Sequence, residues 1–293
     1  MRRRLIPFDG SIEVKTLSDG KYIYARKREG TRNTSQYINK YSDELYSLLV
    51  CQAQELREIK KNIRLIDKRL AEIGYSEKDI SPRLILNIEF ARANIKNLIY
   101  DQAVLEGIET TFPQTETILD NGKVSGVAPS DVLKILNLKR AWEFILDENV
   151  ISSDTNFHML AYIAKIVNEG FYENGGKVRT VPVAIGGSTY LPPIPHEATI
   201  KECLREILAS SLTPIDTAVK LCLYVMKTQV FIDGNKRAVI IFANQYLISK
   251  GQGLIVVPES SVNVFKRLLI DYYEGENEAI VSNYLIEKCW RKF

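Results

Sequence analysis

The stretch Thr228-Gln229-Val230-Phe231-Ile232-Asp233-Gly234-Asn235-Lys236-Arg237 decides how this chain is interpreted. It separates two apolar segments, residues 214–228 and 236–250, which both have the spacing of buried helices. A helix–glycine turn–helix points the free N–H groups at the start of the second helix toward one place. The stretch therefore predicts an anion-binding turn between two core helices.

Each polar residue of this turn has a chemical use. Gly234 lets the backbone approach a phosphate closely, and Lys236 and Arg237 add positive charge to the helix start. The Asp233 carboxylate is a hard oxygen ligand suited to Mg²⁺, while Asn235 can donate to a phosphate oxygen or cap the helix. Asp-Gly-Asn alone would fit an ordinary loop, whereas the whole string favours a phosphate site.

The bulk composition is that of an ordinary globular protein. Of the 293 residues, 45% are hydrophobic and 26% are charged, and no apolar run approaches the roughly 18 residues that span a bilayer. The four cysteines lie far apart, at Cys51, Cys203, Cys222 and Cys289. Their spacing disfavours a zinc site or a disulfide framework. We therefore expect a cytoplasmic protein with reduced thiols and no membrane contact.

The excess of positive charge is confined to the start of the chain. The net charge is +3; residues 1–30 hold eight basic and four acidic residues, and the remainder holds 31 basic and 32 acidic ones. Nucleic acid is therefore disfavoured as a partner of the body of the protein. The basic start could touch an anionic partner, although a solvated terminus is the simpler explanation.

The N-terminal part predicts a hairpin followed by two long helices. Residues 11–28 alternate around Ser18-Asp19-Gly20, which is typical of a β-hairpin. An apolar stripe with steps of three and four predicts a helix over 35–73, and Ser81-Pro82 opens a second helix toward Leu105. We expect these helices to form an antiparallel pair; a coiled-coil arm that makes a homodimer is the alternative.

Residues 108–127, rich in Thr and Gly, are the expected linker. We therefore divide the chain into an N-terminal hairpin and helical region, 1–107, and a core with C-terminal helices, 108–293. Within the core, residues 178–191 predict a second hairpin with its turn at Gly186-Gly187. Helical patterns cover 129–149, 153–170, 198–210, 214–228, 236–250, 259–273 and 277–291. The predicted fold class is mainly α with two small β elements.

The turn resembles the signature of the Fic/Doc family, whose members transfer AMP or related groups from nucleotides to protein hydroxyls. The family pattern is His-x-Phe-x-Asp/Glu-Gly-Asn-Gly/Lys-Arg, and Phe231 and the run Asp233–Arg237 match it in order and spacing. The resemblance covers roughly residues 105–255. It implies a Fic-type helical core that binds ATP with Mg²⁺. The phosphate-binding residues would be Gly234, Asn235, Lys236 and Arg237, and the metal ligand Asp233.

The resemblance extends to the predicted second hairpin. Arg179-Thr180-Val181, leading into Ile185-Gly186-Gly187-Ser188, looks like the family's flap, which holds the target segment by main-chain contacts. Pro192–His196 resembles the proline run that follows the flap. On this basis Ile185, Gly186 and Gly187 are expected to bind a protein substrate or regulatory partner, whose identity the sequence does not give.

Three positions depart from the family. Gln229 stands at the place of the histidine that acts as general base, and an amide cannot take up a proton near neutral pH. Ile240 stands where many members have a second arginine that contacts the terminal phosphate. Glu106 resembles the glutamate of the family's inhibitory helix, yet Gln102 occupies the Ser/Thr position of that motif. Without the second arginine we expect Glu106 to lack its partner, so that its removal changes nucleotide affinity only modestly.

The sequence leaves two functions open. One is a Fic-family protein, related to protein adenylyltransferases, that binds ATP and Mg²⁺ but transfers AMP poorly, because loss of a general base costs about 10²–10⁴ in rate. The alternative is a non-catalytic, nucleotide-binding regulatory or protein-interaction module. Whether the chain is an active enzyme therefore depends on Gln229, and the target, the transferred group and the oligomeric state stay open.

Overall fold

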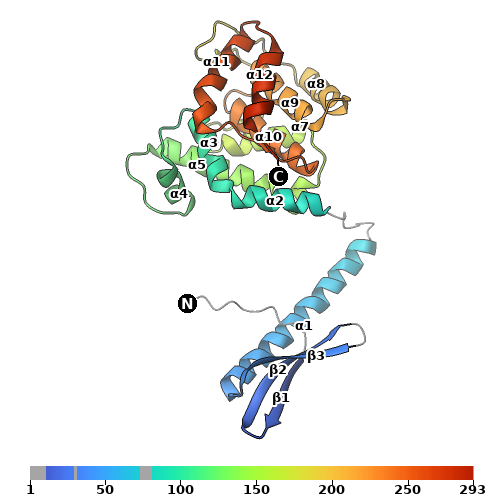
Figure 1. Ribbon diagram of the computed structural model, residues 1–293. Coiled ribbons are helices and arrows are strands. Elements are labelled where there is room, and N and C mark those ends of the chain that lie inside the picture. The colour runs from blue at the N-terminus through green and yellow to red at the C-terminus, as the bar shows by residue number, and fades with distance from the viewer. Residues whose placement is uncertain (1–10, 30–31, 73–80, 293) are drawn as a thin grey trace. The chain divides into compact units, whose positions relative to one another are not determined.

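The computed structural model describes residues 11–29, 32–72 and 81–292 (Figure 1). The chain forms two compact units, Met1–Lys78 and Asp79–Phe293. The described part of the first unit is a small antiparallel sheet with one long helix. The second unit is mainly helical and carries the turn that the sequence singled out.

The first unit is built on strands β1 (Ser11–Leu17), β2 (Gly20–Glu29) and β3 (Arg32–Lys40), in the order β1-β2-β3. Leu17 pairs with Gly20 at the turn, so the predicted hairpin is confirmed. Helix α1 (Asp43–Glu72) contacts β1. Ile23 of β2 and Ala53 of α1 are both buried, which gives this unit a small apolar core of its own.

The predicted helical start at residue 35 is wrong, because residues 32–40 form β3 along the edge of β2. Tyr37 lies opposite Tyr24 across these strands, with ring centroids 5.7 Å apart. Backbone pairing and this aromatic contact outweigh the local helical pattern. On α1, Ile59 and Ile66 are 53% and 54% exposed, so this part of the predicted apolar stripe is not covered by the described residues.

The second unit is a set of helices. Their bounds are α2 (Pro82–Ala93), α3 (Ile95–Leu105), α4 (Phe112–Leu119), α5 (Pro129–Ile145), α6 (Glu148–Ile151), α7 (Phe157–Val167), α8 (Glu197–Ala209), α9 (Pro214–Thr228), α10 (Asn235–Ser249), α11 (Val262–Tyr273) and α12 (Glu278–Tyr284). Ser81 caps α2 by accepting a hydrogen bond from the N–H of Leu84 at 3.2 Å, which confirms the predicted start. The predicted single helix over 81–105 is interrupted at Asn94, whose side chain donates to the Phe90 carbonyl.

Residues 81–107, which the sequence analysis assigned to the N-terminal region, lie in the second compact unit. The reason is apolar burial: Ile88 of α2 and Leu98 and Ile99 of α3 are fully or almost fully enclosed in its core. The two helices expected to form an antiparallel pair, over 35–73 and 81–105, therefore belong to different compact units.

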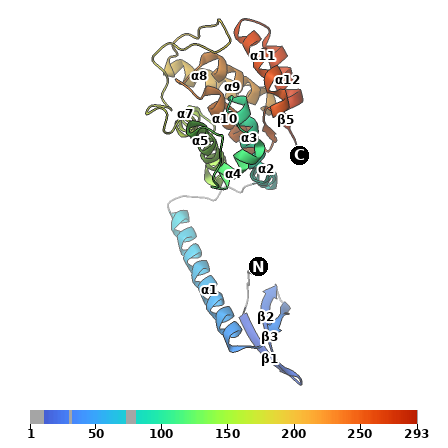
Figure 2. The same cartoon turned by 90° about the vertical axis from the view of Figure 1, so that its left-hand side faces the viewer.

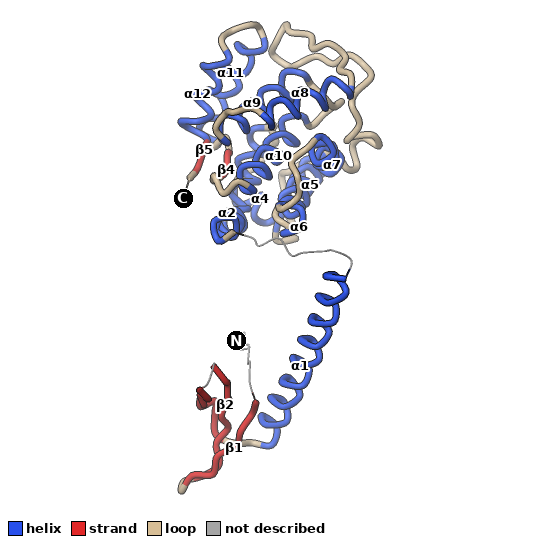
Figure 3. The backbone as a smooth tube through the Cα atoms, turned by 90° about the vertical axis from the view of Figure 1, so that its right-hand side faces the viewer, coloured by secondary structure: helices blue, strands red, loops and turns tan. Residues whose placement is uncertain are grey.

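Helix α10 lies in the middle of the second unit (Figure 2, Figure 3). It contacts α9, α7, α5, α2 and α6, and within residues 235–248 every side chain except that of Lys236 is buried. A helix that is covered on all sides cannot shift without moving its neighbours. The start of α10, where the predicted anion site lies, is therefore fixed by most of the unit.

Several predicted elements differ from the structure. Residues 178–195 contain no strand, so the predicted second hairpin is wrong, although a turn is present at Gly186-Gly187. The expected linker contains α4, and the helix predicted over 277–291 becomes α12 and a π-helical turn, η2 (Leu285–Cys289). The short strands β4 (Leu254–Ile255) and β5 (Trp290–Arg291) pair antiparallel, and a 3-10 turn, η1 (Glu259–Ser261), precedes α11.

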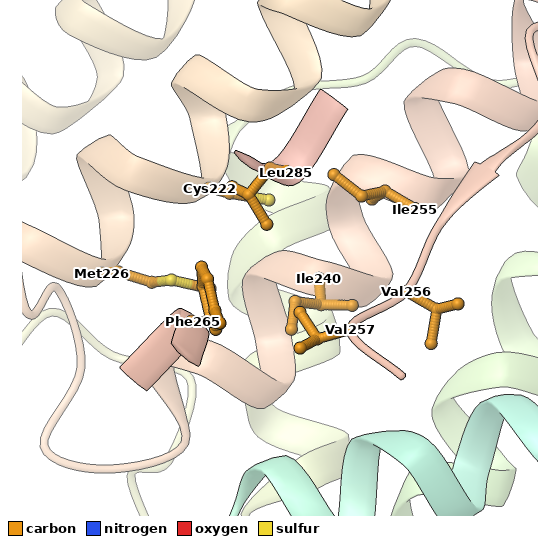
Figure 4. A pocket seen from close by; sticks show the side chains of 8 residues that line it. All are labelled: Cys222, Met226, Ile240, Ile255, Val256, Val257, Phe265 and Leu285. Carbon is orange, nitrogen blue, oxygen red and sulfur yellow. The ribbon is translucent and has the colours of Figure 1, made fainter. Parts of the chain in front are cut away.

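An apolar cavity of about 10 Å³ lies within the core of this unit (Figure 4). Its lining residues are Cys222, Met226, Ile240, Ile255, Val256, Val257, Phe265 and Leu285. The cavity is no larger than one water and offers no polar partner, so it is a packing defect rather than a ligand site. Ile240 points into this cluster, which explains why an apolar residue is accommodated there.

Candidate functional site

The turn between α9 and α10 begins and ends with left-handed residues. Gln229 follows the last residue of α9 with φ 49° and ψ 63°, and Gly234 precedes α10 with φ 72°. Between them, Val230 and Phe231 are fully buried and anchor the turn in the core. A Cβ atom on Gly234 would lie 2.8 Å from Asn168 Oδ1, so both backbone conformation and space require glycine here.

Asn235 holds the turn together from inside. Its Oδ1 accepts from the Phe231 N–H at 2.9 Å, and its Nδ2 donates to the Phe231 carbonyl at 2.8 Å and to Gln229 Oε1 at 3.0 Å. The sequence allowed this residue to serve as a phosphate ligand or as a cap. In the structure its side chain is committed to the turn, so Asn235 shapes the site and offers a ligand its backbone N–H.

Gln229 has its carboxamide engaged at both ends. Nε2 donates to the Met226 carbonyl at 2.6 Å, and Oε1 accepts from Asn235. The residue still lines the pocket in front of α10. Its side chain is thus placed at the site and can be approached by a ligand, but it carries no group that titrates near neutral pH.

Arg237 is buried and has a structural role, and its charge is paired. It is 2% exposed, and its guanidinium donates to Asp233 Oδ2 at 2.8 Å and to the Val167 carbonyl at 3.0 Å. Asn168 adds to this connection by donating to the Asp233 carbonyl at 2.9 Å. Asp233 and Arg237 were predicted as metal and phosphate ligands; the structure brings them together as an ion pair, with Asp233 half-exposed at the pocket.

Glu106, at the end of α3, reaches the same arginine. Its Oε2 lies 3.3 Å from Arg237 Nε and its Oε1 lies 4.0 Å from Lys236 Nζ, and the side chain is 12% exposed. The expectation that Glu106 lacks a partner is therefore wrong: with Ile240 in the core, Arg237 takes that place. Glu106 Oε1 and Arg237 Nε have no hydrogen bond within the described residues, so the contact is an ion pair without hydrogen-bond geometry.

Gln102, one turn before Glu106, connects the inhibitory-like helix to α10. Its Nε2 donates to the Arg237 carbonyl at 2.8 Å, and its Oε1 accepts from Trp142 Nε1 at 3.0 Å. All three groups are buried. The departure from Ser/Thr at this position thus has a structural role, since it fixes α3 against the first turn of α10.

A pocket of about 330 Å³ opens in front of the turn. It is lined by Glu106, Ala184, Ile185, Gly186, Gln229, Asp233, Gly234, Asn235, Lys236, Lys266, Leu269, Ile270 and Tyr273. The structure therefore gathers most predicted site residues around one space. Gly187 and Arg237 are not among the lining residues. The four residues from α11 were missed; their spacing marks one helix face in the sequence, but only packing places that face at the turn.

Residues 178–195, which we call the flap loop, reach the pocket through Ile185 and Gly186. Arg179 fixes the base of this loop: it is 3% exposed, and its guanidinium donates to the carbonyls of Val181, Pro193 and Gln229 at 2.6–2.7 Å. Longer bonds run to the carbonyls of Pro192 and Thr228, at 3.1 and 3.3 Å. Burial lowers the pKa of the Arg179 guanidinium, which nonetheless stays charged at any physiological pH.

The tip of the flap loop is fixed by Glu274, just after α11. Its Oε1 accepts from the Thr189 N–H at 2.8 Å and from the hydroxyls of Ser188 and Thr189 at 3.1 Å. The backbone hydrogen bond from Thr189, followed by the two hydroxyl bonds, lowers the pKa of Glu274. The loop is thus held at its base and its tip, while the segment between them lies along the pocket.

The residues at the turn are compatible with a magnesium nucleotide. No cluster of three or more His, Cys, Asp and Glu side chains suited to a metal ion occurs among the described residues. Mg²⁺, however, is commonly held by one or two carboxylates together with phosphate oxygens and water. Asp233 presents one such carboxylate beside the N-terminus of α10, so this donor set fits a metal that arrives with its phosphates.

Together these features define a mainly helical protein with small antiparallel sheets. A glycine turn precedes its central helix, α10, and the start of this helix lines a charged pocket. Among the described residues, no helix is both long and apolar enough to span a bilayer.

Comparison with known proteins assigns this architecture. Residues 155–247 match the Fic/DOC family, and residues 1–47 match a domain of unknown function, DUF6788. Residues 155–247 thus form a Fic/DOC family domain, which contains the flap loop and the turn. No curated protein is significantly similar in sequence.

Solved Fic-domain structures share the fold. A Fic domain-containing signaling protein from Bacteroides thetaiotaomicron is 18% identical, with 76% of this chain and 86% of that chain covered and a TM-score of 0.55. Fic-1 (residues 134–508) from C. elegans is 16% identical, with 82% and 73% covered and a TM-score of 0.56. A Fic family protein from Desulfovibrio desulfuricans is 15% identical, with 79% and 70% covered and a TM-score of 0.56.

Proposed function

We propose that the protein binds ATP or a related nucleotide with Mg²⁺ at the start of α10 and is related to protein adenylyltransferases, with transfer of AMP slowed by Gln229. The observation that carries the proposal is the open N-terminus of α10, where Gly234, Asn235 and Lys236 line one charged pocket. Unpaired N–H groups and the positive end of the helix dipole favour phosphate at such a place.

Each group would have a distinct role. The backbone N–H groups after Gly234 and the Lys236 ammonium would bind phosphate oxygens. Asp233 would hold Mg²⁺, which neutralises phosphate charge when bound. Arg237 would keep Asp233 in place through their ion pair. The flap loop would present a protein segment at Ile185 and Gly186, next to the same pocket.

Gln229 would limit the reaction. By its spacing from Phe231 it occupies the position of the family's general base. Its amide can accept a hydrogen bond from a target hydroxyl but cannot remove the proton as the α-phosphate is attacked. Positioning and charge stabilisation would remain, because both come from the backbone and from cations.

The alternative is a non-catalytic nucleotide-binding module that regulates or binds another protein. The hydrogen bonds at both ends of the Gln229 carboxamide favour it, because they give the residue a role in the turn that has no need of catalysis.

Substitution Gln229→His tests the proposal. Histidine tolerates the left-handed backbone at this position better than most residues do, so the turn should be preserved. Transfer of labelled AMP to the protein itself or to lysate proteins is measured for wild type, Gln229→His and Gln229→Ala. We expect wild type and Gln229→Ala to be nearly silent and Gln229→His to gain about 10²-fold or more.

The outcomes separate the two functions. Robust AMP transfer by wild type would contradict the proposal that Gln229 slows the reaction. Silence of Gln229→His, with nucleotide binding confirmed by calorimetry, would favour the binding module. Failure of wild type to bind any magnesium nucleotide would rule out both.

We also place the protein in a reducing compartment such as the cytoplasm. Its cysteines, including the exposed Cys51, are free thiols. Recovery of a Cys51-linked disulfide from cells lysed with a thiol-blocking reagent would contradict this location.

A further inference from the structure

Lys266 is a pocket residue for which the fold supplies no partner. It lies on α11, is half-buried, and lines the same pocket as the turn. Among the described residues, no hydrogen bond and no ion pair within 4 Å involves its ammonium group. Burial lowers the pKa of Lys266, the charge of Lys236 lowers it further, and Glu106 opposes the shift. The lysine is thus kept in a place that disfavours its charge.

A neighbouring lysine shows how a structural lysine is accommodated in this fold. Lys227, at the end of α9, donates to the Tyr272 carbonyl at 2.9 Å. Its ammonium also lies 4.2 Å from the centre of the Tyr272 ring. Within the part of the chain that the structure describes, Lys266 has neither kind of contact. Packing alone therefore gives no reason for a cation at this position.

The charges in the pocket are not balanced around Lys266. Arg237 is paired with Asp233 at 2.8 Å. The single carboxylate of Glu106 lies 3.3 Å from Arg237 Nε and 4.0 Å from Lys236 Nζ, so it is already shared by two cations. Lys266 consequently experiences the repulsion of Lys236 with little compensation. An anion that enters between the two lysines would stabilise both charges, because each lysine would then have an opposite charge nearby.

We propose that Lys236 and Lys266 bind the same polyphosphate chain from two sides, and that Lys266 makes the pocket select nucleoside di- and triphosphates over monophosphates. The inference rests on the proposed function and assigns a ligand class to its site. A monophosphate at the start of α10 would be bound by the backbone N–H groups and Lys236 alone. A second cation from α11 adds binding energy only if the ligand carries negative charge beyond its first phosphate.

Calorimetry on the full chain tests this selectivity with Mg²⁺ and four probes: ATP, ADP, AMP and inorganic pyrophosphate. The variants are Lys266→Met, Lys266→Gln and Lys266→Arg. Arg267→Met is the matched control, since it removes a charge from the next, exposed position of α11 and does not line the pocket. Thermal melting of each variant establishes that it is folded before affinities are compared.

We expect Lys266→Met and Lys266→Gln to weaken ATP, ADP and pyrophosphate about 10-fold or more, as loss of one charge-assisted contact does. AMP should change by less than about 3-fold, since its single phosphate needs no second cation. Lys266→Arg should retain most of the affinity, and Arg267→Met should match wild type.

Two failures are distinguishable. If wild type binds none of the probes, the proposed function fails and this inference fails with it. If wild type binds ATP while the Lys266 variants lose nothing, or lose ATP and AMP equally, only the role of Lys266 is overturned.

Discussion

The turn at residues 229–237 and the flap loop at residues 178–195 face the same pocket but are held in different ways. In the turn, Asn235 alone makes three hydrogen bonds to neighbouring residues, and both Asn235 and its partner Phe231 are buried. The flap loop has no strand ladder and depends on Arg179 at its base and Glu274 at its tip.

This difference separates two requirements of the proposed site. A phosphate site gains from N–H groups that do not have to reorganise, and the turn supplies these from the fixed end of a buried helix. A segment that receives a protein target gains from accessible main-chain groups, and between its two anchors the flap loop has no strand pairing that would occupy them. Substitutions in the turn and in the flap loop should therefore have separate effects.

Asn235→Ala should have the largest effect, because it removes the internal support of the turn. The buried Phe231 N–H and carbonyl would both lose their side-chain partner. We expect a loss of about 3 kcal/mol or more in the free energy of unfolding, and loss of nucleotide binding. Denaturant unfolding and calorimetry measure both. Asn235→Asp retains the acceptor for the Phe231 N–H, so its free energy of unfolding should lie between those of wild type and Asn235→Ala. A loss below about 1 kcal/mol in Asn235→Ala would show that other residues support the turn.

Arg179→Met should act on the flap loop while leaving α10 in place. The carbonyls of Val181, Pro192 and Pro193 would lose the guanidinium that donates to all three. Residues 180–191 should therefore become sensitive to limited proteolysis. Global stability should fall by about 2 kcal/mol, since the freed carbonyls can turn to water. Arg179→Lys should rescue only part of the effect, because one ammonium cannot reproduce the planar fork of a guanidinium.

Equal protection of residues 180–191 in wild type and Arg179→Met would contradict this assignment. Exposed Arg205, on α8, gives a suitable control for the loss of one arginine, and Arg205→Met should leave the cleavage pattern unchanged.

The sequence was sufficient where local signals agree with packing. Thr213 and Pro214 start α9 and Gly234 starts α10 almost where periodicity and capping predict them. It was insufficient where residues distant in the sequence determine the conformation of a segment. The extended pattern over 178–185 predicts a strand, but the structure has no strand there. Arg179, whose partners lie up to 50 residues away, fixes the segment instead. Glu106 and Lys266 are likewise placed by the packing of α3 and α11, which no local pattern encodes.

Glu106→Gln should strengthen ATP binding. The Glu106 carboxylate lies 4.0 Å from the Lys236 ammonium, which is the cation proposed to bind phosphate, so it would compete with a bound phosphate for Lys236. Removing the charge should raise ATP affinity about 5- to 10-fold, in contrast to the modest change expected from sequence alone. Calorimetry measures this, and Glu109→Gln, a nearby exposed acidic residue, is the control. Unchanged affinity would show that the ion pair is structural and that Glu106 does not oppose the nucleotide.

The smallest effect concerns Glu274 and appears only at acid pH. Hydrogen bonds from Thr189 and Ser188 stabilise its ionised form and lower its pKa from the ordinary 4.5. A lowered pKa in the folded state means that the anchor is fully present above about pH 4.5 and is lost as pH falls through the lower value. In a sample labelled with ¹⁵N-threonine, the Thr189 amide shift should therefore titrate with a midpoint below 4.5 in wild type. It should not titrate in Glu274→Gln, whose amide oxygen still accepts the hydrogen bonds but carries no charge. Glu278→Gln, which alters a carboxylate bonded to Tyr272 rather than to the loop, should leave the Thr189 titration unchanged. A midpoint at or above 4.5 would mean that the Glu274 carboxylate does not hold the tip of the flap loop.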